Sequence, residues 1–255
     1  MKSILLLTLF AVSSPLSAQD GAVAIQQPEA AGAETLMPNQ KAFLNLPSES
    51  RKDFVKHLEE SGRLFQQKRI FEALDELEKT SKIFADSPEI YNLRGSCFIE
   101  MRAFEKALDQ FKKADALSKD NPSIEFNIAE VYFCTKEWKK SVDILEKVLK
   151  ETAPGNMALS RLVEFKIMLC KKKLGLKDEA EILANKYDDQ DDSPYYYYAQ
   201  AAMAYDAANL VKAEEWLAMA GRVFQDPNVI APWQDTMVEY GYIKSFYGDD
   251  PAAVK

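Results

Sequence analysis

Apolar and polar residues follow one another along most of this chain with the spacing of amphipathic helices. From about residue 48 to residue 247, segments with this pattern are separated by polar breaks, and prolines open several of them, as at Pro88, Pro122 and Pro194. Proline suits the first turn of a helix, where its missing N–H is not needed. Glycine is scarce, at 9 of 255 residues, which favours helix over turn-rich β structure. The pattern predicts an all-α protein.

The helical segments repeat at a constant spacing. The unit that opens at Pro88 aligns with the unit that opens at Pro122, and each continues into a second helical segment. Small residues match (Gly95 with Ala129, Ala107 with Ser141), and so do aromatic residues (Phe98 with Tyr132, Phe104 with Trp138). In a helical hairpin, the small residues let two helices cross closely and the aromatic residues fill the space between them. Because one hairpin cannot bury its own apolar face, such units are expected to stack.

This pattern resembles the tetratricopeptide repeat family, whose period of about 34 residues equals the spacing from Pro88 to Pro122. Weaker copies flank the two clear units, so the resemblance covers roughly residues 49–225 as five units. It implies an all-α, tetratricopeptide-type solenoid of about five helical hairpins. The last helical segment, about residues 229–247, carries Trp233, Met237, Tyr240, Ile243 and Phe246. It is predicted to be a C-terminal capping helix that covers the last exposed face of the repeats.

The start of the chain, from Met1 to Ala18, is predicted to be a signal peptide. Lys2 precedes an apolar run over residues 4–12, and small residues then lead to a cleavage site after Ala18. The run is shorter than the roughly 20 residues that a spanning helix needs, and an uncleaved anchor is the alternative. The predicted organisation is a signal peptide (1–18), a flexible leader (19–47), tetratricopeptide-type repeats (48–228), and a capping helix with the C-terminal tail (229–255).

The signal peptide and the charge narrow the location and the partners. Export to the periplasm or the exterior of a bacterium is expected, without a lipid anchor, because no cysteine lies near the cleavage site. The net charge of −8 disfavours nucleic acid and anionic lipid as partners. The odd number of cysteines argues against a disulfide framework. Cys97, Cys134 and Cys170 are expected to be buried thiols, with a Cys97–Cys134 bridge as the alternative.

Candidate catalytic chemistry is sparse in this sequence. His57 is the single histidine, which excludes multi-histidine metal sites, and no nucleophile or phosphate-binding motif occurs. The acidic run at residues 188–192 lacks the glycine and the later glutamate of an EF-hand loop. It is interpreted as an exposed loop whose end, Asp192 or Ser193, caps the helix that Pro194 opens. No catalytic residue, cofactor or metal is predicted, and the protein is not expected to be an enzyme.

The resemblance also implies that the first helices of successive units line a concave face. The candidate partner-binding residues at groove positions are Phe126, Glu130, Phe133, Tyr195, Tyr198 and Tyr205. They form an aromatic groove with acidic points, so the expected ligand is a peptide or helix with apolar anchors and some positive charge. Packing between helices is the alternative role for the same aromatic rings.

These observations favour a protein–protein interaction or scaffold module of the cell envelope. A self-assembling structural component would use the same repeats for oligomers and remains the first alternative. A glycan- or small-molecule-handling protein with unrecognised hydrolytic activity is the second. The fold follows from the pattern, whereas the function rests on analogy with the family.

Overall fold

The computed structural model describes residues 36–153 and 155–244 of the chain. The predicted signal peptide and most of the predicted leader lie outside these residues. The helices of the described part are α1 (Pro38–Leu44), α2 (Ser48–Gln66), α3 (Ile70–Ile83), α4 (Pro88–Glu100), α5 (Phe104–Leu117), α6 (Pro122–Cys134), α7 (Trp138–Glu151), α8 (Met157–Lys173), α9 (Lys177–Ala184), α10 (Tyr195–Asp206), α11 (Leu210–Val223) and α12 (Pro227–Tyr240). Among them, no helix combines the length and the apolar character that crossing a membrane requires.

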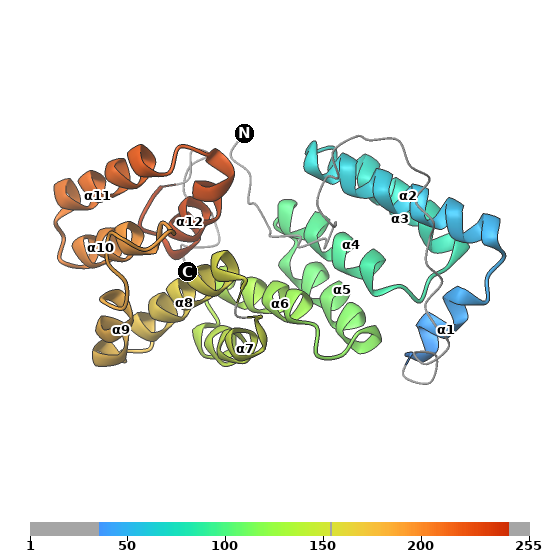
Figure 1. The fold of residues 1–255 in the computed structure, drawn as a ribbon, viewed down its shortest axis with the longest axis horizontal. Helices are drawn as coiled ribbons and strands as arrows, with labels where there is room; N and C mark the ends of the chain where they lie inside the picture. Colours follow the sequence, from blue (N-terminus) through green and yellow to red (C-terminus); the bar gives the residue numbers. More distant parts are fainter. Residues whose placement is uncertain (1–35, 154, 245–255) are drawn as a thin grey trace.

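Five helical hairpins stack into a curved array. The hairpins are α2–α3, α4–α5, α6–α7, α8–α9 and α10–α11, and the second helix of one unit packs on the first helix of the next, as α5 does on α6 (Figure 1). This arrangement confirms the predicted all-α solenoid. The array bends so that α12 lies inside its curve, beside α6 and α8 (Figure 1).

The turn within each hairpin repeats as regularly as the helices do. Lys68, Arg102 and Lys136 occupy the same place in successive units, and each has a left-handed backbone with φ of 61°, 56° and 64°. In each turn the amide of the next residue donates to a carbonyl five residues back, as from Ala103 N to Phe98 O at 2.8 Å. This bond satisfies a carbonyl that the end of the first helix would leave without a partner. The sequence period therefore reflects one helix–turn–helix geometry used repeatedly.

The small residues stand where helices approach most closely. A Cβ added to Gly95 would lie 2.6 Å from Cε1 of Phe111, which is too close for any real contact. Ser141 on α7 is fully buried and donates from Oγ to the Ala129 carbonyl on α6 at 3.0 Å. The predicted reason for the small positions is thus confirmed at both clear units. Cys97 and Cys170 are buried free thiols, as expected, whereas Cys134 is a free thiol that is only partly buried, and the alternative Cys97–Cys134 bridge is absent from this structure.

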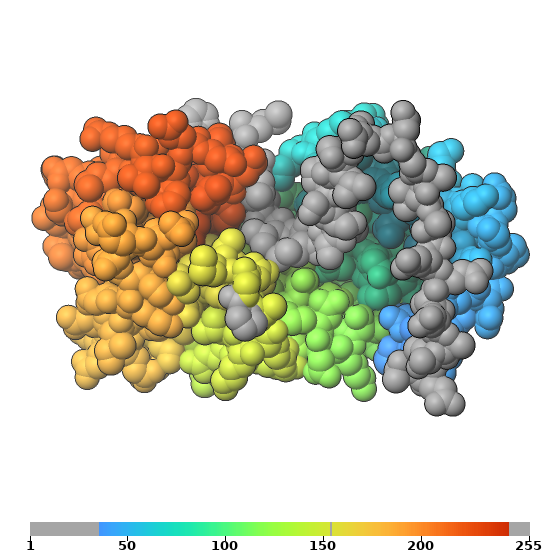
Figure 2. Space-filling view, viewed as in Figure 1, coloured from blue at the N-terminus to red at the C-terminus, as the bar shows by residue number. Residues whose placement is uncertain are grey.

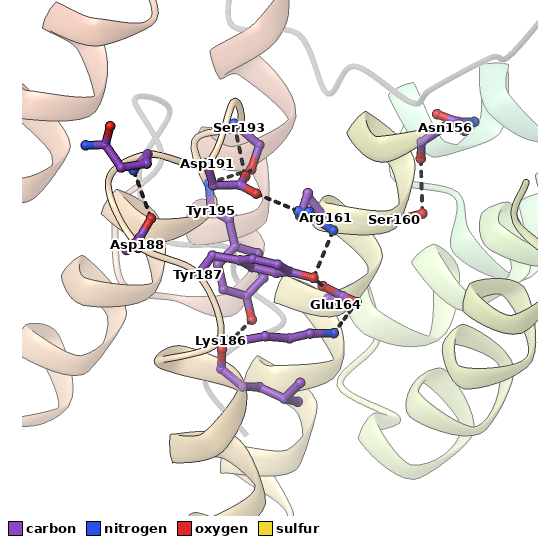
Figure 3. A network of polar contacts seen from close by, with 12 residues as sticks. Asn156, Ser160, Arg161, Glu164, Lys186, Tyr187, Asp188, Asp191, Ser193 and Tyr195 are labelled. Carbon is purple, nitrogen blue, oxygen red and sulfur yellow. Dashed lines mark hydrogen bonds and ion pairs between the residues drawn. The ribbon is translucent and has the colours of Figure 1, made fainter. Parts of the chain in front are cut away.

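The fourth hairpin is irregular, and a polar network supports it. Helix α9 has only 8 residues, and the chain after it returns to α10 through the acidic run. Arg161 on α8 pairs with Asp191 at 3.0 Å and donates to Tyr187 Oη at 2.8 Å, and Tyr187 donates to Glu164 at 2.6 Å (Figure 3). Ser193 Oγ accepts a hydrogen bond from the Tyr195 amide at 3.2 Å, at the start of α10. The acidic run therefore helps to fix the α9–α10 connection.

Two boundaries differ from the sequence-based expectation. The predicted flexible leader contains α1, which packs on the first hairpin because its Phe43 ring lies 4.9 Å from Phe54 and 5.5 Å from Phe84. The C-terminal helix predicted for about residues 229–247 spans Pro227–Tyr240 and ends at Gly241, whose backbone is left-handed with φ of 102°. Its main contacts are with α6 and α8 and not with α11. At the place where α7 carries the buried Val142, α11 carries the exposed Glu214, although α11 also leaves apolar side chains exposed at Leu210, Val211, Met219 and Val223.

Candidate functional site

The six candidate partner-binding residues lie on α6 and α10, on the side of the array that α12 covers. We call this side, formed by α6, α8 and α10, the concave face. The two phenylalanines and two of the three tyrosines are buried: Phe126 (2% exposed), Phe133 (0%), Tyr195 (0%) and Tyr198 (1%). Glu130 and Tyr205 are partly buried. In this structure the aromatic rings therefore pack inside the protein, as the alternative interpretation proposed.

Helix α12 covers the concave face through one apolar stripe. Its members Ile230, Trp233, Met237 and Tyr240 are separated by 3, 4 and 3 residues and are at most 7% exposed. This spacing places all of them on one side of a helix. In the space-filling view, α10–α12 and α8 form one continuous block at the C-terminal end of the molecule (Figure 2).

The two large rings of the stripe contact the two ends of the concave face. The Trp233 centroid lies 5.3 Å from that of Phe165 on α8 and 5.6 Å from that of Tyr198 on α10. Tyr240 lies 6.3 Å from Phe133 on α6 and 5.6 Å from Trp138 on α7. Aromatic pairs at such distances add about 0.5–1.5 kcal/mol each to the energy of burial. The concave face thus already holds an amphipathic helix by aromatic anchors.

The acidic points of the concave face are neutralised by lysines. Glu130 on α6 pairs with Lys166 on α8 at 2.9 Å, and the Lys166 side chain is only 3% exposed. Burial raises the pKa of Glu130, and Lys166 opposes that shift. Asp206 at the end of α10 forms an ion pair with Lys172. The carboxylates of Glu130 and Asp206, which were expected to be the acidic points of the groove, are therefore paired with lysines of the same chain in this structure. In that state they offer little negative charge to a positively charged partner.

Positive charge instead gathers around the C-terminal end of α12. Arg102, from the α4–α5 turn, pairs with Glu239 at 2.8 Å, and Lys136, from the α6–α7 turn, donates to the Glu239 main-chain carbonyl. Lys173 lies 4.5 Å from the centre of the Tyr240 ring. Cations near the last turn of a helix are favourable because the helix dipole is negative there. These residues contact the C-terminal end of α12 in the position that it has here.

A small cavity, lined by both polar and apolar side chains, remains between α12 and the helices α6 and α8. It has a volume of about 20 Å³ and lies between Glu130, Cys134 and Lys166 of the array and Thr236 and Glu239 of α12. Burial raises the pKa of the Cys134 thiol well above its usual value. The contact of α12 with α6 and α8 is therefore not completely filled at this point.

Tyr205 is covered by a residue that follows α12. Its ring stacks on Tyr242 with the centroids 5.1 Å apart and the planes at 12°, and Tyr242 Oη donates to Asp206 at 2.5 Å. Tyr205 Oη itself donates to Glu214 on α11 at 2.7 Å.

Sequence reasoning missed the residues of this site that come from turns and from α8. Arg102 and Lys136 occupy equivalent turn positions, and Lys166 lies in the least regular unit. The repeat period could have shown that Arg102 and Lys136 are equivalent. Only the position of α12 shows what they contact.

Comparison with known proteins identifies the fold. No protein-family model and no curated protein matches the chain. Among solved structures, it resembles YrrB, described as a TPR protein with an unusual peptide-binding site (18% identity, TM-score 0.50, 78% of this chain and 98% of YrrB). It also resembles PilF of Pseudomonas aeruginosa, with 13% identity and a TM-score of 0.54 over 76% of this chain and 94% of PilF. A third similar structure is TTC0263, a thermophilic TPR protein of Thermus thermophilus, with 16% identity and a TM-score of 0.53 over 72% of this chain and 99% of TTC0263. At these identities the likeness shows the fold alone.

Proposed function

We propose, from the premise that this chain is a tetratricopeptide-type repeat protein, that it is an interaction module that binds a helix of a partner protein on its concave face. The observation that carries the proposal is the position of α12, an amphipathic helix bound there through Trp233 and Tyr240. Helix-in-groove binding uses anchors at this spacing. The peptide-binding site named for YrrB supports the same use of the fold by analogy.

The chemistry of the concave face suits a protein partner. Large rings dominate it, and aromatic side chains contribute contact area at a low cost in conformational entropy. Its buried charges are paired, as Glu130 is with Lys166. The cations Arg102, Lys136 and Lys173 lie at one end only and select a helix by its direction. This combination favours recognition over catalysis.

We also propose that the module acts in the cell envelope. The sequence of residues 1–18, with Lys2 followed by an apolar run and small residues before Ala18, supports export. Mature protein isolated from its native cells is expected to begin at Gln19. N-terminal sequencing that finds Met1 in the envelope fraction would support an uncleaved anchor instead.

The test of partner binding is a pull-down in which α12 is either locked in place or free. Cys134 and Glu239 line the same cavity, so an E239C variant allows α12 to be cross-linked to α6 through the Cys134 thiol. The bait is the chain from Gln19, and the reduced form of the same variant is its matched control. We expect a defined envelope protein to be retained by the reduced bait and lost by the locked bait. Equal retention by both baits would place binding elsewhere on the surface.

A further inference from the structure

We infer that α12 is a resident occupant of the concave face and that the partner's helix takes its place by copying its chemistry. This inference rests on the proposed function and specifies the partner. The partner helix carries apolar anchors at places 1, 4, 8 and 11, as α12 does at Ile230, Trp233, Met237 and Tyr240. The anchor at place 4 is a large aromatic residue. A carboxylate at place 10 corresponds to Glu239 and faces Arg102.

The position of α12 is that of a docked segment and not of the next helix in the array. In each earlier hairpin, the second helix packs against the first helix of the following hairpin, as α7 does on α8. Helix α12 instead makes its main contacts with α6 and α8, which belong to the third and fourth hairpins. The short segment of residues 224–226 links it to α11. Because the concave face holds α12 in place, a helix with the same anchors can compete for that face.

The contact of α12 also contains features that weaken it. Pro232 lies inside the helix, where it removes a main-chain hydrogen bond. The Glu130–Lys166 pair is buried under α12, and both desolvation and the nearby charge of Glu239 raise the pKa of Glu130. The cavity at Cys134 leaves part of this contact unfilled. A helix without the proline, whose side chains fill the cavity, would therefore bind better than α12 does.

The largest anchor and the direction of the helix are the two features that select a partner. Trp233 contacts rings of both α8 and α10, Phe165 and Tyr198, so its counterpart must be large and flat. Arg102 and Lys136 hold the last turn of α12 by a side chain and a carbonyl. A helix that ran in the opposite direction would place its positive dipole end against these cations.

The test is the binding of a labelled peptide of residues 226–243 to the full chain. In the wild-type chain α12 competes with this peptide, whereas a chain with Trp233→Ala has lost the main anchor of its own α12. We expect the Trp233→Ala chain to bind the peptide at least about tenfold more tightly than wild type, because the binding-competent open state is more populated. Val229→Ala, at a position 40% exposed on the same helix, is the matched control and should resemble wild type.

Variant peptides test the chemistry of the occupant. A peptide with Trp233→Ala should bind the opened chain at least about tenfold more weakly, since it lacks the largest anchor. A peptide with Glu239→Lys should also bind more weakly, and that difference should shrink as salt is added. Equal binding of all three peptides would overturn the assignment of anchors and direction. If the Trp233→Ala chain has lost helicity, Tyr240→Ala serves as the second opened chain.

The outcomes separate this inference from the proposed function. Peptide binding that is no stronger to either opened chain than to wild type overturns the replacement of α12, even if a partner protein is retained in the pull-down. If the opened chains bind the peptide but the pull-down retains no partner protein, the replacement of α12 is supported and the proposed function is contradicted. The wild-type chain could also sediment as a dimer that the peptide dissociates. That result would show that α12 of a second copy occupies the concave face, and it would overturn the proposal of a different partner protein.

Discussion

At the scale of single residues, the matched small positions explain how the hairpins close. Gly95 faces the Phe111 ring so closely that no side chain fits between them. One unit later Ala129 takes the place of Gly95, and the buried Ser141 on the second helix is the facing small residue, which donates a hydrogen bond to the Ala129 carbonyl. Size at these positions is therefore fixed by the distance between two helices. Helix propensity alone would prefer alanine at Gly95.

Replacing Gly95 with alanine should destabilise the protein in spite of alanine's better helix propensity. The added Cβ would meet the Phe111 ring at 2.6 Å and force it to move, which we expect to cost about 1–3 kcal/mol of unfolding free energy. Gly221→Ala is the matched control, because nothing lies within 4 Å of its added Cβ, and it should gain up to about 1 kcal/mol. Urea denaturation followed by circular dichroism measures both. A stable Gly95→Ala variant would show that Phe111 adapts without cost.

At the scale of elements, α12 is held by side chains far from it in sequence. Its stripe binds rings of α6, α8 and α10, and its last turn is held by the turn residues Arg102 and Lys136. Cys134 faces the cavity under this helix, whereas Cys97 belongs to the core between the first two hairpins. The two thiols therefore report on different parts of the fold.

Loosening α12 should expose the partly buried Cys134 thiol further and leave the buried Cys97 protected. Burial raises the pKa of Cys134 well above its usual value and that of Cys97 to about 12, so both should react slowly with a thiol reagent at pH 8. In a Trp233→Ala chain, we expect Cys134 to react at least about tenfold faster because α12 opens more often. Mass spectrometry of peptides after timed labelling distinguishes the sites. Equal acceleration at Cys97 would indicate general unfolding.

At the scale of the whole molecule, the core is divided along the array. One cluster joins the first two hairpins around Leu77 and Ile90. A second lies around Phe111, and a third extends from α6 to α12 around Phe165 and Trp233. In stacked repeats, each unit contacts mainly its neighbours, so stability is distributed along the array. Helix α12 adds contacts between units that are not neighbours, from Arg102 in the second hairpin to Tyr198 in the fifth.

Substitutions in the two end clusters should therefore have local effects. Trp233→Ala should increase hydrogen exchange in α6, α8 and α10 and leave α2 and α3 unchanged, while Leu77→Ala should do the reverse. Each change removes a buried side chain and should lower the free energy of unfolding of the hairpins around it by about 2–5 kcal/mol. Exchange measured by mass spectrometry on wild type and both variants provides the comparison. A uniform increase along the array in either variant would mean that the molecule unfolds as one cooperative unit.

The sequence by itself determined the repeating element and its packing. The constant repeat period and the small positions at Gly95, Ala107, Ala129 and Ser141 predicted the hairpins, because these features depend only on contacts within a unit and with its neighbour. The segment with Trp233, Met237 and Tyr240 was likewise predicted to be a helix that covers an apolar face. Local spacing is sufficient for such conclusions.

Only the tertiary structure decided where that apolar side lies. The stripe of α12 could cover the end of α11 or the concave face, and the helical pattern is the same in both cases. The choice depends on contacts between residues more than 100 positions apart, such as Arg102 with Glu239 and Lys136 with the Glu239 carbonyl. It also decides that Phe133 and Tyr198 are buried and that Glu130 is neutralised by Lys166. Periodicity carries no information about such contacts, because it describes only one helix or one repeat at a time.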